Sequence, residues 1–372
     1  MKTNWQTKKL SDICDKASSN ISQNQLKNEE GEYPIYGASG FIKNISFYHQ
    51  DKDYISIIKD GAGIGRIALL PAKSSVIGTL QYLLPKQNID IRFLYYILNG
   101  FDFSKYKNGS TIPHIYFREY SEEKFLVPPL PEQKRIVKKL DEVFEKVATA
   151  KENAEKNLQN SKELFEVYLQ NVFKNHGKDW DEQGLVSLCE VEYGYTEKAK
   201  ISGKYRFVRI TDTDEDGLLT QENKMYVGSF KDAGQYILNN GDLLMARTGA
   251  SAGNVLFYEG NEEAVFASYL IRLKFKKEIS SKLYWFFSKS KLYWNQVRQL
   301  SAGSAQPQFN GGALKKIVFP FPKSLTEQKA IIKKLGALSG ETKKLEKIYE
   351  QKLADFEELK KSVLRQAFTG KL

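Results

Sequence analysis

Apolar residues follow two different spacings along this chain. In residues 1–131 and 175–326, short runs rich in β-branched and aromatic residues are separated by glycine turns, a pattern that predicts strands. The runs are YISII at 54, RIALL at 66, YRFVRI at 205, DLLMA at 242 and NVLFY at 254. Each region also has one apolar stretch typical of a helix, IRFLYYILNG from 91 and SKLYWFFSKSKLYWNQVRQL from 281. The sequence therefore predicts two domains with an α+β fold.

The spacing becomes helical over residues 132–174 and 327–372. Apolar positions recur there in steps of three and four, and neither segment contains a proline. The seam is Ile136, Leu140, Val143, Val147, Ala150, Ala154, Ser161, Leu164 and Tyr168 in the first segment, and Ile331, Leu335, Leu338, Thr342, Leu345, Tyr349, Phe356, Leu359 and Val363 in the second. Prolines in VPPLPEQ and FPFPKSLTEQ end the domain before each segment. Two long helices that form a coiled coil are therefore expected.

The two halves of the chain repeat each other. EQKRIVKKL at 132 returns as EQKAIIKKL at 327, and residues 132–173 align with residues 327–368 at a constant offset of 195. IIKDGAGIGRIAL at 57 matches MARTGASAGNVLF at 245, and GSTIP at 109 matches GSAQP at 303. Self-similarity of this extent indicates a duplication, in which each half is a divergent domain followed by a similar helix.

The duplication predicts how the helices pair. If the seams bury each other, the second helix runs antiparallel to the first and relates the two halves by a pseudo-two-fold axis. The 42 helical residues of one copy would span about 63 Å. A second apolar row lies beside each seam, which suggests either helices from partner subunits or packing under the adjacent domains. The candidate interface residues of this row are Val137, Phe144, Phe165, Leu169, Ile332, Ile348, Leu353 and Leu364.

Composition narrows the class of protein. With 372 residues and 41% apolar content, the chain can form two cores of ordinary size. No signal-peptide segment and no apolar window long enough to span a membrane is evident, so a soluble, cytoplasmic protein without a membrane role is expected. Cys14 and Cys189 are too few for a disulfide framework or a cysteine-built zinc site. The net charge of +11 permits nucleic-acid binding without establishing it.

Two motifs suggest chemistry on first sight. GASAG at 249–253 fits the G-x-S-x-G of hydrolases with Ser251 as the nucleophile, but every histidine precedes that serine and the matching GAGIG at 61–65 has Gly63 there. DTDEDGLLTQEN at 212–223 resembles half of an EF-hand loop, but Asn223 replaces the bidentate glutamate. We therefore expect GASAG to be a glycine-rich turn without a nucleophile, and the acidic stretch to be a β-turn without calcium. An alternative is a metal-dependent nuclease or hydrolase that uses the acidic cluster from Asp212 to Glu222.

Several phrases resemble a known family. YPIYGASG at 33, GSTIP at 109, PPLPEQKRIVKKL at 128, GSAQP at 303, TEQKAIIKKL at 326 and the terminal LRQAFTGKL are similar to the DNA specificity subunits of type I restriction-modification systems. The resemblance covers the whole chain. The second half departs from it, because FPFPKSLTEQ and YRFVRITD stand where PPLPEQ and YPIYGASG occur in the first.

The resemblance implies two target-recognition domains, residues 1–131 and 175–326, that each read one half of a split duplex DNA sequence. The helices would bind two modification subunits that methylate adenine with S-adenosylmethionine, and motor-nuclease restriction subunits would complete the complex. This chain would be non-catalytic and hold no cofactor or metal. The DNA-contact candidates are Lys59, Arg66, Thr111 and His114 in the first domain and Arg247, Asn254, Gln306 and Gln308 in the second. A coiled-coil scaffold without a DNA role is the remaining alternative.

Overall fold

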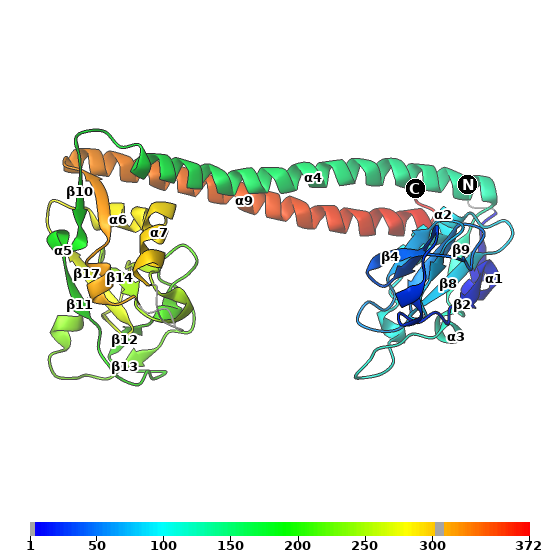
Figure 1. The fold of residues 1–372 in the computed structure, drawn as a ribbon, viewed down its shortest axis with the longest axis horizontal. Coiled ribbons are helices and arrows are strands. Elements are labelled where there is room, and N and C mark those ends of the chain that lie inside the picture. The colour runs from blue at the N-terminus through cyan, green and yellow to red at the C-terminus, as the bar shows by residue number, and fades with distance from the viewer. Residues whose placement is uncertain (1–3, 302–308) are drawn as a thin grey trace. The chain divides into compact units, whose positions relative to one another are not determined.

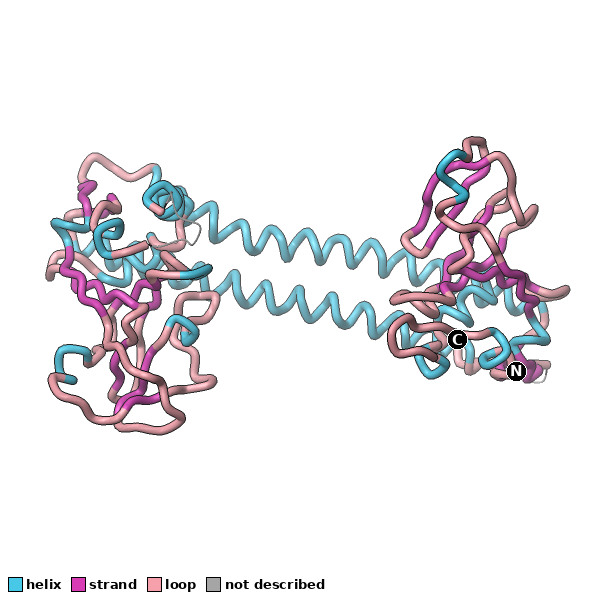
Figure 2. Tube along the Cα trace, turned by 60° about the horizontal axis from the view of Figure 1, so that its bottom comes forward, coloured by secondary structure: helices cyan, strands magenta, loops and turns pink. Residues whose placement is uncertain are grey.

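The computed structural model describes residues 4–301 and 309–372. It divides into two compact units, Met1–Glu155 with Glu350–Leu372, and Lys156–Tyr349. Each unit contains one mixed α/β domain together with part of helix α4 (Leu130–Lys174) and part of helix α9 (Leu325–Phe368) (Figure 1). Both long helices are uninterrupted between these bounds (Figure 2). The two domains and the two long helices expected from the sequence are therefore confirmed.

The first domain is built from three small sheets. Its strands are β1 (Gln6–Lys9), β2 (Cys14–Ser18), β3 (Tyr33–Gly37), β4 (Gly40–Ile45), β5 (Tyr54–Ile58), β6 (Ile67–Leu70), β7 (Ser75–Val76), β8 (Leu80–Pro85) and β9 (Lys124–Val127). Its helices are α1 (Leu10–Ile13), α2 (Ile91–Asn99) and α3 (Phe117–Tyr120). The sheets have the strand orders β2-β8-β5-β6, β4-β3-β7 and β1-β9. Within the second sheet, β3 and β7 are parallel.

The second domain repeats this topology strand for strand. Its strands are β10 (Trp180–Gly184), β11 (Cys189–Tyr193), β12 (Tyr205–Val208), β13 (Tyr226–Val227), β14 (Leu243–Ala246), β15 (Val255–Phe257), β16 (Ala264–Phe266), β17 (Leu270–Phe275) and β18 (Val318–Pro322). Its helices are α5 (Leu185–Leu188), α6 (Ser281–Phe287), α7 (Lys291–Leu300) and α8 (Gly311–Leu314). The orders are β11-β17-β14-β15, β13-β12-β16 and β10-β18, with β12 and β16 parallel. The internal repeat predicted from the sequence is thus present in the fold.

One element differs from its prediction. The apolar stretch from residue 281 forms two helices rather than one, because the chain turns at residues 288–290. The buried Ser290 caps the second helix, where its hydroxyl accepts a hydrogen bond from the N–H of Tyr293 at 3.2 Å. The Ser288 hydroxyl donates to the carbonyl of Trp285 at 2.8 Å and satisfies the end of the first helix. Helical periodicity continues through this turn in the sequence, which hides the break.

The long helices are antiparallel within the first unit. Lys151 on α4 pairs with Glu357 on α9 at 2.7 Å, whereas Arg135, sixteen residues earlier on α4, donates to the carbonyl of Leu372 at 3.1 Å. Residue numbers therefore fall along one helix as they rise along the other. Most seam residues are buried or partly buried, but Leu164, Leu345 and Leu359 are exposed. A strict heptad drifts relative to an α-helix of 3.6 residues per turn, which brings some seam positions to the surface.

Most of the second apolar row belongs to the chain's own cores. Val137, Leu169 and Leu364 are buried, and Phe144, Phe165 and Ile332 are partly buried against the domain cores. The Phe144 ring lies 5.5 Å from that of Tyr96 in α2. These six residues pack under the adjacent domains, so they do not form a free docking surface. Ile348, 49% exposed, and the partly exposed Leu353 remain candidates for a partner interface.

Across residues 4–301 and 309–372, no helix combines the length and apolar content needed to cross a membrane.

Candidate nucleic-acid interface

The best-matched loops of the two domains are hairpin turns built on glycine. Residues 59–66 join β5 to β6, and residues 247–254 join β14 to β15. Gly61 and Gly65 have φ angles of +98° and +80°, and their counterparts Gly249 and Gly253 have +75° and +93°. These left-handed angles favour glycine, which explains why the motif recurs while the side chains between the glycines change. Each loop is a fixed backbone frame with variable polar side chains.

A second loop in the first domain is tied to this frame. The N–H of Gly61 donates to the carbonyl of Pro113 at 2.9 Å, and the N–H of Ile115 donates to the carbonyl of Lys59 at 2.9 Å. Asn108 and His114 exchange two backbone hydrogen bonds, at 2.8 and 2.9 Å, and close the loop that carries the GSTIP sequence. The structure therefore brings together two segments that the sequence separates by about fifty residues.

Three charged or titratable groups meet where these loops join. The Asp60 carboxylate lies 3.2 Å from Nδ1 of His114 and 3.8 Å from Nζ of Lys59. All three side chains are about one third exposed, so the ion pairs are open to solvent and to a ligand. Asp60 thus orients Lys59 and His114, two of the DNA-contact candidates, on one surface.

Arg66 and Asp60 line the same cavity next to this surface. The cavity has a volume of about 650 Å³ and is walled by the β3–β4 turn, by the β5–β6 turn with Asp60, and by Arg66. Phe41, near the start of β4, lines it and is 60% exposed. The Arg66 guanidinium makes one long hydrogen bond, 3.4 Å, to the carbonyl of Ala38. Thr111 is exposed in the GSTIP loop. A cationic group beside an exposed ring fits a nucleic-acid surface.

Arg247 occupies the position of Lys59 in the second domain. The N–H of Lys59 donates to the carbonyl of Thr79, and its carbonyl accepts from Ile115; the N–H of Arg247 donates to the carbonyl of Tyr269, and its carbonyl accepts from Phe309. The guanidinium carbon of Arg247 lies 5.4 Å from the ring centre of Tyr193 and 5.9 Å from that of Tyr269. Both tyrosines are about half exposed.

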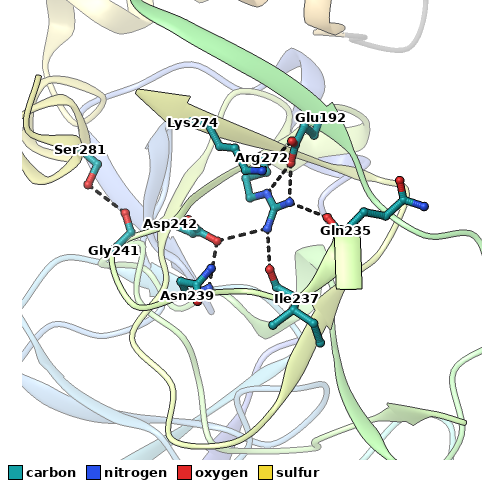
Figure 3. A network of polar contacts seen from close by, with 9 residues as sticks. All are labelled: Glu192, Gln235, Ile237, Asn239, Gly241, Asp242, Arg272, Lys274 and Ser281. Atoms are coloured by element: carbon teal, nitrogen blue, oxygen red, sulfur yellow. Dashed lines mark hydrogen bonds and ion pairs between the residues drawn. The ribbon is translucent and has the colours of Figure 1, made fainter. Parts of the chain in front are cut away.

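A buried arginine aligns the strands that carry these tyrosines. Arg272 on β17 is 2% exposed and donates to Glu192 on β11, and to the carbonyls of Ile237 and Gln235 at 2.6 Å each (Figure 3). Asp242 lies 3.4 Å from the same guanidinium. Glu192 and Arg272 face each other in the β11–β17 register, one residue before Tyr193 and three residues after Tyr269. This ion pair therefore fixes the strand ends from which both rings project.

The structure does not group the other DNA-contact candidates of the second domain with Arg247. Asn254 is exposed and lines a different cavity of about 440 Å³, whose walls include the acidic loop and the unit's parts of α4 and α9. Gln306 and Gln308 lie outside the described residues. Of the second-domain candidates, only Arg247 is therefore placed with further contacts on the loop surface.

The carboxylates of the acidic stretch at 212–223 form ion pairs and hydrogen bonds within the second unit. Asp212 pairs with Arg209 at 2.7 Å, and the Asp214 carboxylate accepts hydrogen bonds from the N–H groups of Asp216 and Leu218 at 2.9 and 2.8 Å. Asp216 pairs with Lys343 on α9. The acidic β-turn expected from the sequence is present, and three of its carboxylates are already engaged. Among the described residues, no group of three or more His, Cys, Asp or Glu side chains is arranged to hold a metal ion.

Ser251 lies in a short 3-10 turn, Gly249–Ser251, between two antiparallel strands. A nucleophile elbow requires a strand that turns directly into a helix. The G-x-S-x-G pattern therefore reflects the glycine frame.

Comparison with a protein-family model shows which family this chain belongs to. The model for the type I restriction modification DNA specificity domain matches residues 2–159 and again residues 177–353. The chain belongs to this family. The double match follows the duplication seen in the loops and sheets, with one specificity domain in each half.

Relatives of this specificity-domain chain carry matching names. The specificity subunit of the type I restriction enzyme MjaVIII from Methanocaldococcus jannaschii is 24% identical over 92% of this chain and 87% of its own. That of StySPI from Salmonella potsdam is 26% identical over 66% of this chain and 57% of its own. A solved structure concerned with the assembly of a type I system has a TM-score of 0.78 at 17% identity, covering 99% of this chain and 98% of that one. The HsdS subunit of Thermoanaerobacter tengcongensis has a TM-score of 0.62 at 16% identity, covering 99% and 97%. These structures support the fold.

Sequence reasoning did not single out Asp60 on the loop surface of the first specificity domain, or Tyr193 and Tyr269 on that of the second. Tyr193 directly precedes Gly194, and tyrosines beside glycines are a usable signal for an exposed ring. Tyr269 gives no such signal, because its partnership with Arg247 depends on strands far apart in the chain.

Proposed function

We propose that this chain is the DNA specificity subunit of a type I restriction-modification complex. Each domain reads one half of a split duplex target, and the chain itself carries out no chemistry. The observation that carries the proposal is the duplicated loop frame, which presents Lys59 in one domain and Arg247 in the other at equivalent backbone positions. A loop frame that both domains share, with different polar side chains on each copy, suits two readers of different base sequences.

The proposed partners follow from the family. Two modification subunits would supply S-adenosylmethionine and the methyl transfer to adenine, and restriction subunits would supply the motor and nuclease. Exposed apolar side chains on the second unit's parts of α4 and α9 offer a docking face for a modification subunit. They are Leu164, Val167, Leu345 and Ile348, with exposures between 38% and 57%. Exposed apolar residues gathered on helices favour a protein partner.

Reconstitution tests the proposal. The chain alone should bind duplex DNA in a salt-dependent manner and neither methylate nor cut it. Together with its cognate modification subunits, it should direct adenine methylation to one split sequence, detected by sequencing modified bases in treated DNA. Methyl transfer or metal-dependent cleavage by the chain alone would contradict a specificity subunit. Salt-independent or absent DNA binding in the complex would favour the scaffold.

A further inference from the structure

Arg247 differs from the other arginines of its domain in its contacts. Residues 175–326 contain five arginines, and four of them donate to oxygen atoms of side chains or backbone: Arg206, Arg209, Arg272 and Arg298. The Arg247 guanidinium instead lies near the two tyrosine rings and donates to no oxygen atom among the described residues. The Nε of Arg206 is also buried without a partner, but the other nitrogens of that guanidinium are hydrogen-bonded, so Arg247 is distinguished by having its whole guanidinium unengaged within the described part of the domain.

Two aromatic rings lie within cation–π distance of the guanidinium, at 5.4 and 5.9 Å from its central carbon. Arginine can interact with an aromatic face and still use its planar fork of donors for hydrogen bonds. Tyr193 is itself anchored, because its hydroxyl accepts a hydrogen bond from the N–H of Gly311 at 3.1 Å. A Cβ at Gly311 would lie 2.8 Å from that hydroxyl, so any other residue there would displace the Tyr193 ring. One of the two rings beside Arg247 is thus fixed before any ligand arrives.

The first domain lacks this arrangement at the same place. In the strand registers, Ser18 and Gln81 pair as Tyr193 and Ile271 do, so Ser18 stands where Tyr193 stands. Thr79 takes the place of Tyr269, since the carbonyl of each accepts a hydrogen bond from the equivalent N–H, that of Lys59 or Arg247. Lys59 therefore has no flanking rings and is paired with Asp60 instead. A lysine is a point charge, whereas a held arginine offers two parallel donors.

We infer that Arg247, which lies beside the rings of Tyr193 and Tyr269, reads a guanine in the half-site of the second domain. Guanine presents O6 and N7 in the major groove, the pair of acceptors that an arginine fork matches. A phosphate needs no such planar fork, because a point charge such as a lysine ammonium can bind it. The inference rests on the proposed function and specifies one base that the domain recognises.

The test uses the full chain in complex with its cognate modification subunits and a library of duplexes in which every position of the target is varied. Methylated products are sequenced for the wild type, Arg247→Lys, Arg247→Ala and Tyr193→Phe. The wild type should require a guanine in one half-site. Both Arg247 variants should reduce that preference about tenfold or more, with the other half-site and the spacer unchanged. Tyr193→Phe keeps the ring but loses the hydrogen bond from Gly311, so it should reduce the preference less than either Arg247 variant.

Lys59→Ala is the matched control, because it lies at the equivalent position and should weaken methylation of all sequences by a similar factor. Uniform loss in the Arg247 variants would assign Arg247 to a phosphate and overturn the inference. So would an unchanged motif in those variants, or a wild-type motif without guanine in either half. Thermal melting of each variant detects unfolding, and Arg247→Lys retains the charge if Arg247→Ala unfolds. A wild-type complex without any sequence-specific methylation would refute the proposed function itself.

Discussion

The side-chain carbonyl of Gln133 accepts a hydrogen bond from the N–H of Asp90 at 2.8 Å, which joins the start of α4 to the start of α2. Its amide nitrogen donates to the carbonyls of Asn88 and Pro128 at 3.0 and 2.9 Å. In the second domain, Gln328 accepts from Ser280 at 2.8 Å and donates to Glu278 and Pro322 at 3.0 and 2.9 Å. Both glutamines are buried. The repeated phrase EQK thus fastens each domain to its own long helix.

Replacing either glutamine should therefore destabilise its domain. Gln133→Leu and Gln328→Leu each leave one buried N–H and two carbonyls without their partner, and we expect a loss of about 2 to 4 kcal/mol in unfolding free energy. Denaturant titration followed by circular dichroism measures it. The exposed neighbours provide controls, since Lys134→Ala and Lys329→Ala should change stability by less than about 0.5 kcal/mol. Equal effects of the glutamine and lysine variants would contradict the fastening role.

Arg272 gives a second stability prediction. Arg272→Ala removes the partner of Glu192, Asp242 and two carbonyls at once, so a loss of about 3 to 5 kcal/mol is expected. Burial raises the pKa of Glu192, but hydrogen bonds from Lys274 and Arg272 outweigh it and hold the pKa below its usual value. The stabilisation from this carboxylate is therefore present at neutral pH and lost as the pH falls through the depressed pKa. Unfolding of the wild type and Glu192→Gln, compared from pH 7 to pH 3, should converge at the acidic end.

The lowered pKa of Lys289 predicts that the free energy of unfolding depends on pH above pH 8. Burial lowers the pKa of Lys289 to about 8 from 10.5, even though its Nζ donates to the carbonyl of Asp216 at 2.6 Å and lies 3.6 Å from the ring centre of Trp285. Because the folded state binds this proton more weakly, stability should rise as the pH increases from 8 to 10.5, by at most about 3 kcal/mol.

The matched variant is Lys289→Met, which keeps the length of the side chain and removes the titration. The difference in unfolding free energy between the wild type and Lys289→Met should shift in favour of the wild type as the pH rises. A difference that stays constant from pH 7 to pH 10 would show that the lysine titrates as it does in water.

Sequence reasoning reached the architecture because its signals are local. A proline-free seam in steps of three and four reports a helix directly, and an offset of 195 reports the duplication. The break at Ser288–Ser290 was missed because it depends on capping within an otherwise periodic stretch. The contact between Arg247 and Tyr193 was missed because the β11–β17 pairing brings Tyr193 beside a loop about 55 residues away. Burial of Val137 and Leu169 likewise depends on which neighbours cover them.

The exposed apolar residues on the second unit's helices predict an effect on assembly. Ile348→Asp combined with Leu164→Asp should weaken binding of a modification subunit by about tenfold or more, because both side chains would lose apolar contacts and bury a charge. Isothermal titration of the full chain with its modification subunit measures the affinity. Since both positions are exposed, the melting temperature should stay within a few degrees of the wild type. Unchanged affinity would place the docking face elsewhere.

The length of the helices predicts the distance between the half-sites. By the register of Lys151 with Glu357, positions near Ala154 on α4 and Leu353 on α9 oppose each other, so a seven-residue insertion at both keeps the seam in phase. The insertion adds about 10 Å, comparable to three base pairs at roughly 3.4 Å each. Added base pairs also rotate one half-site around the duplex, so the variant should either methylate sites with a longer spacer or lose activity. Any active variant should keep the half-site bases, because we propose that the loops of the two domains, such as the one that carries Arg247, read them. Altered half-site bases with the original spacer, found by sequencing methylated DNA, would show that the helices do not set the distance.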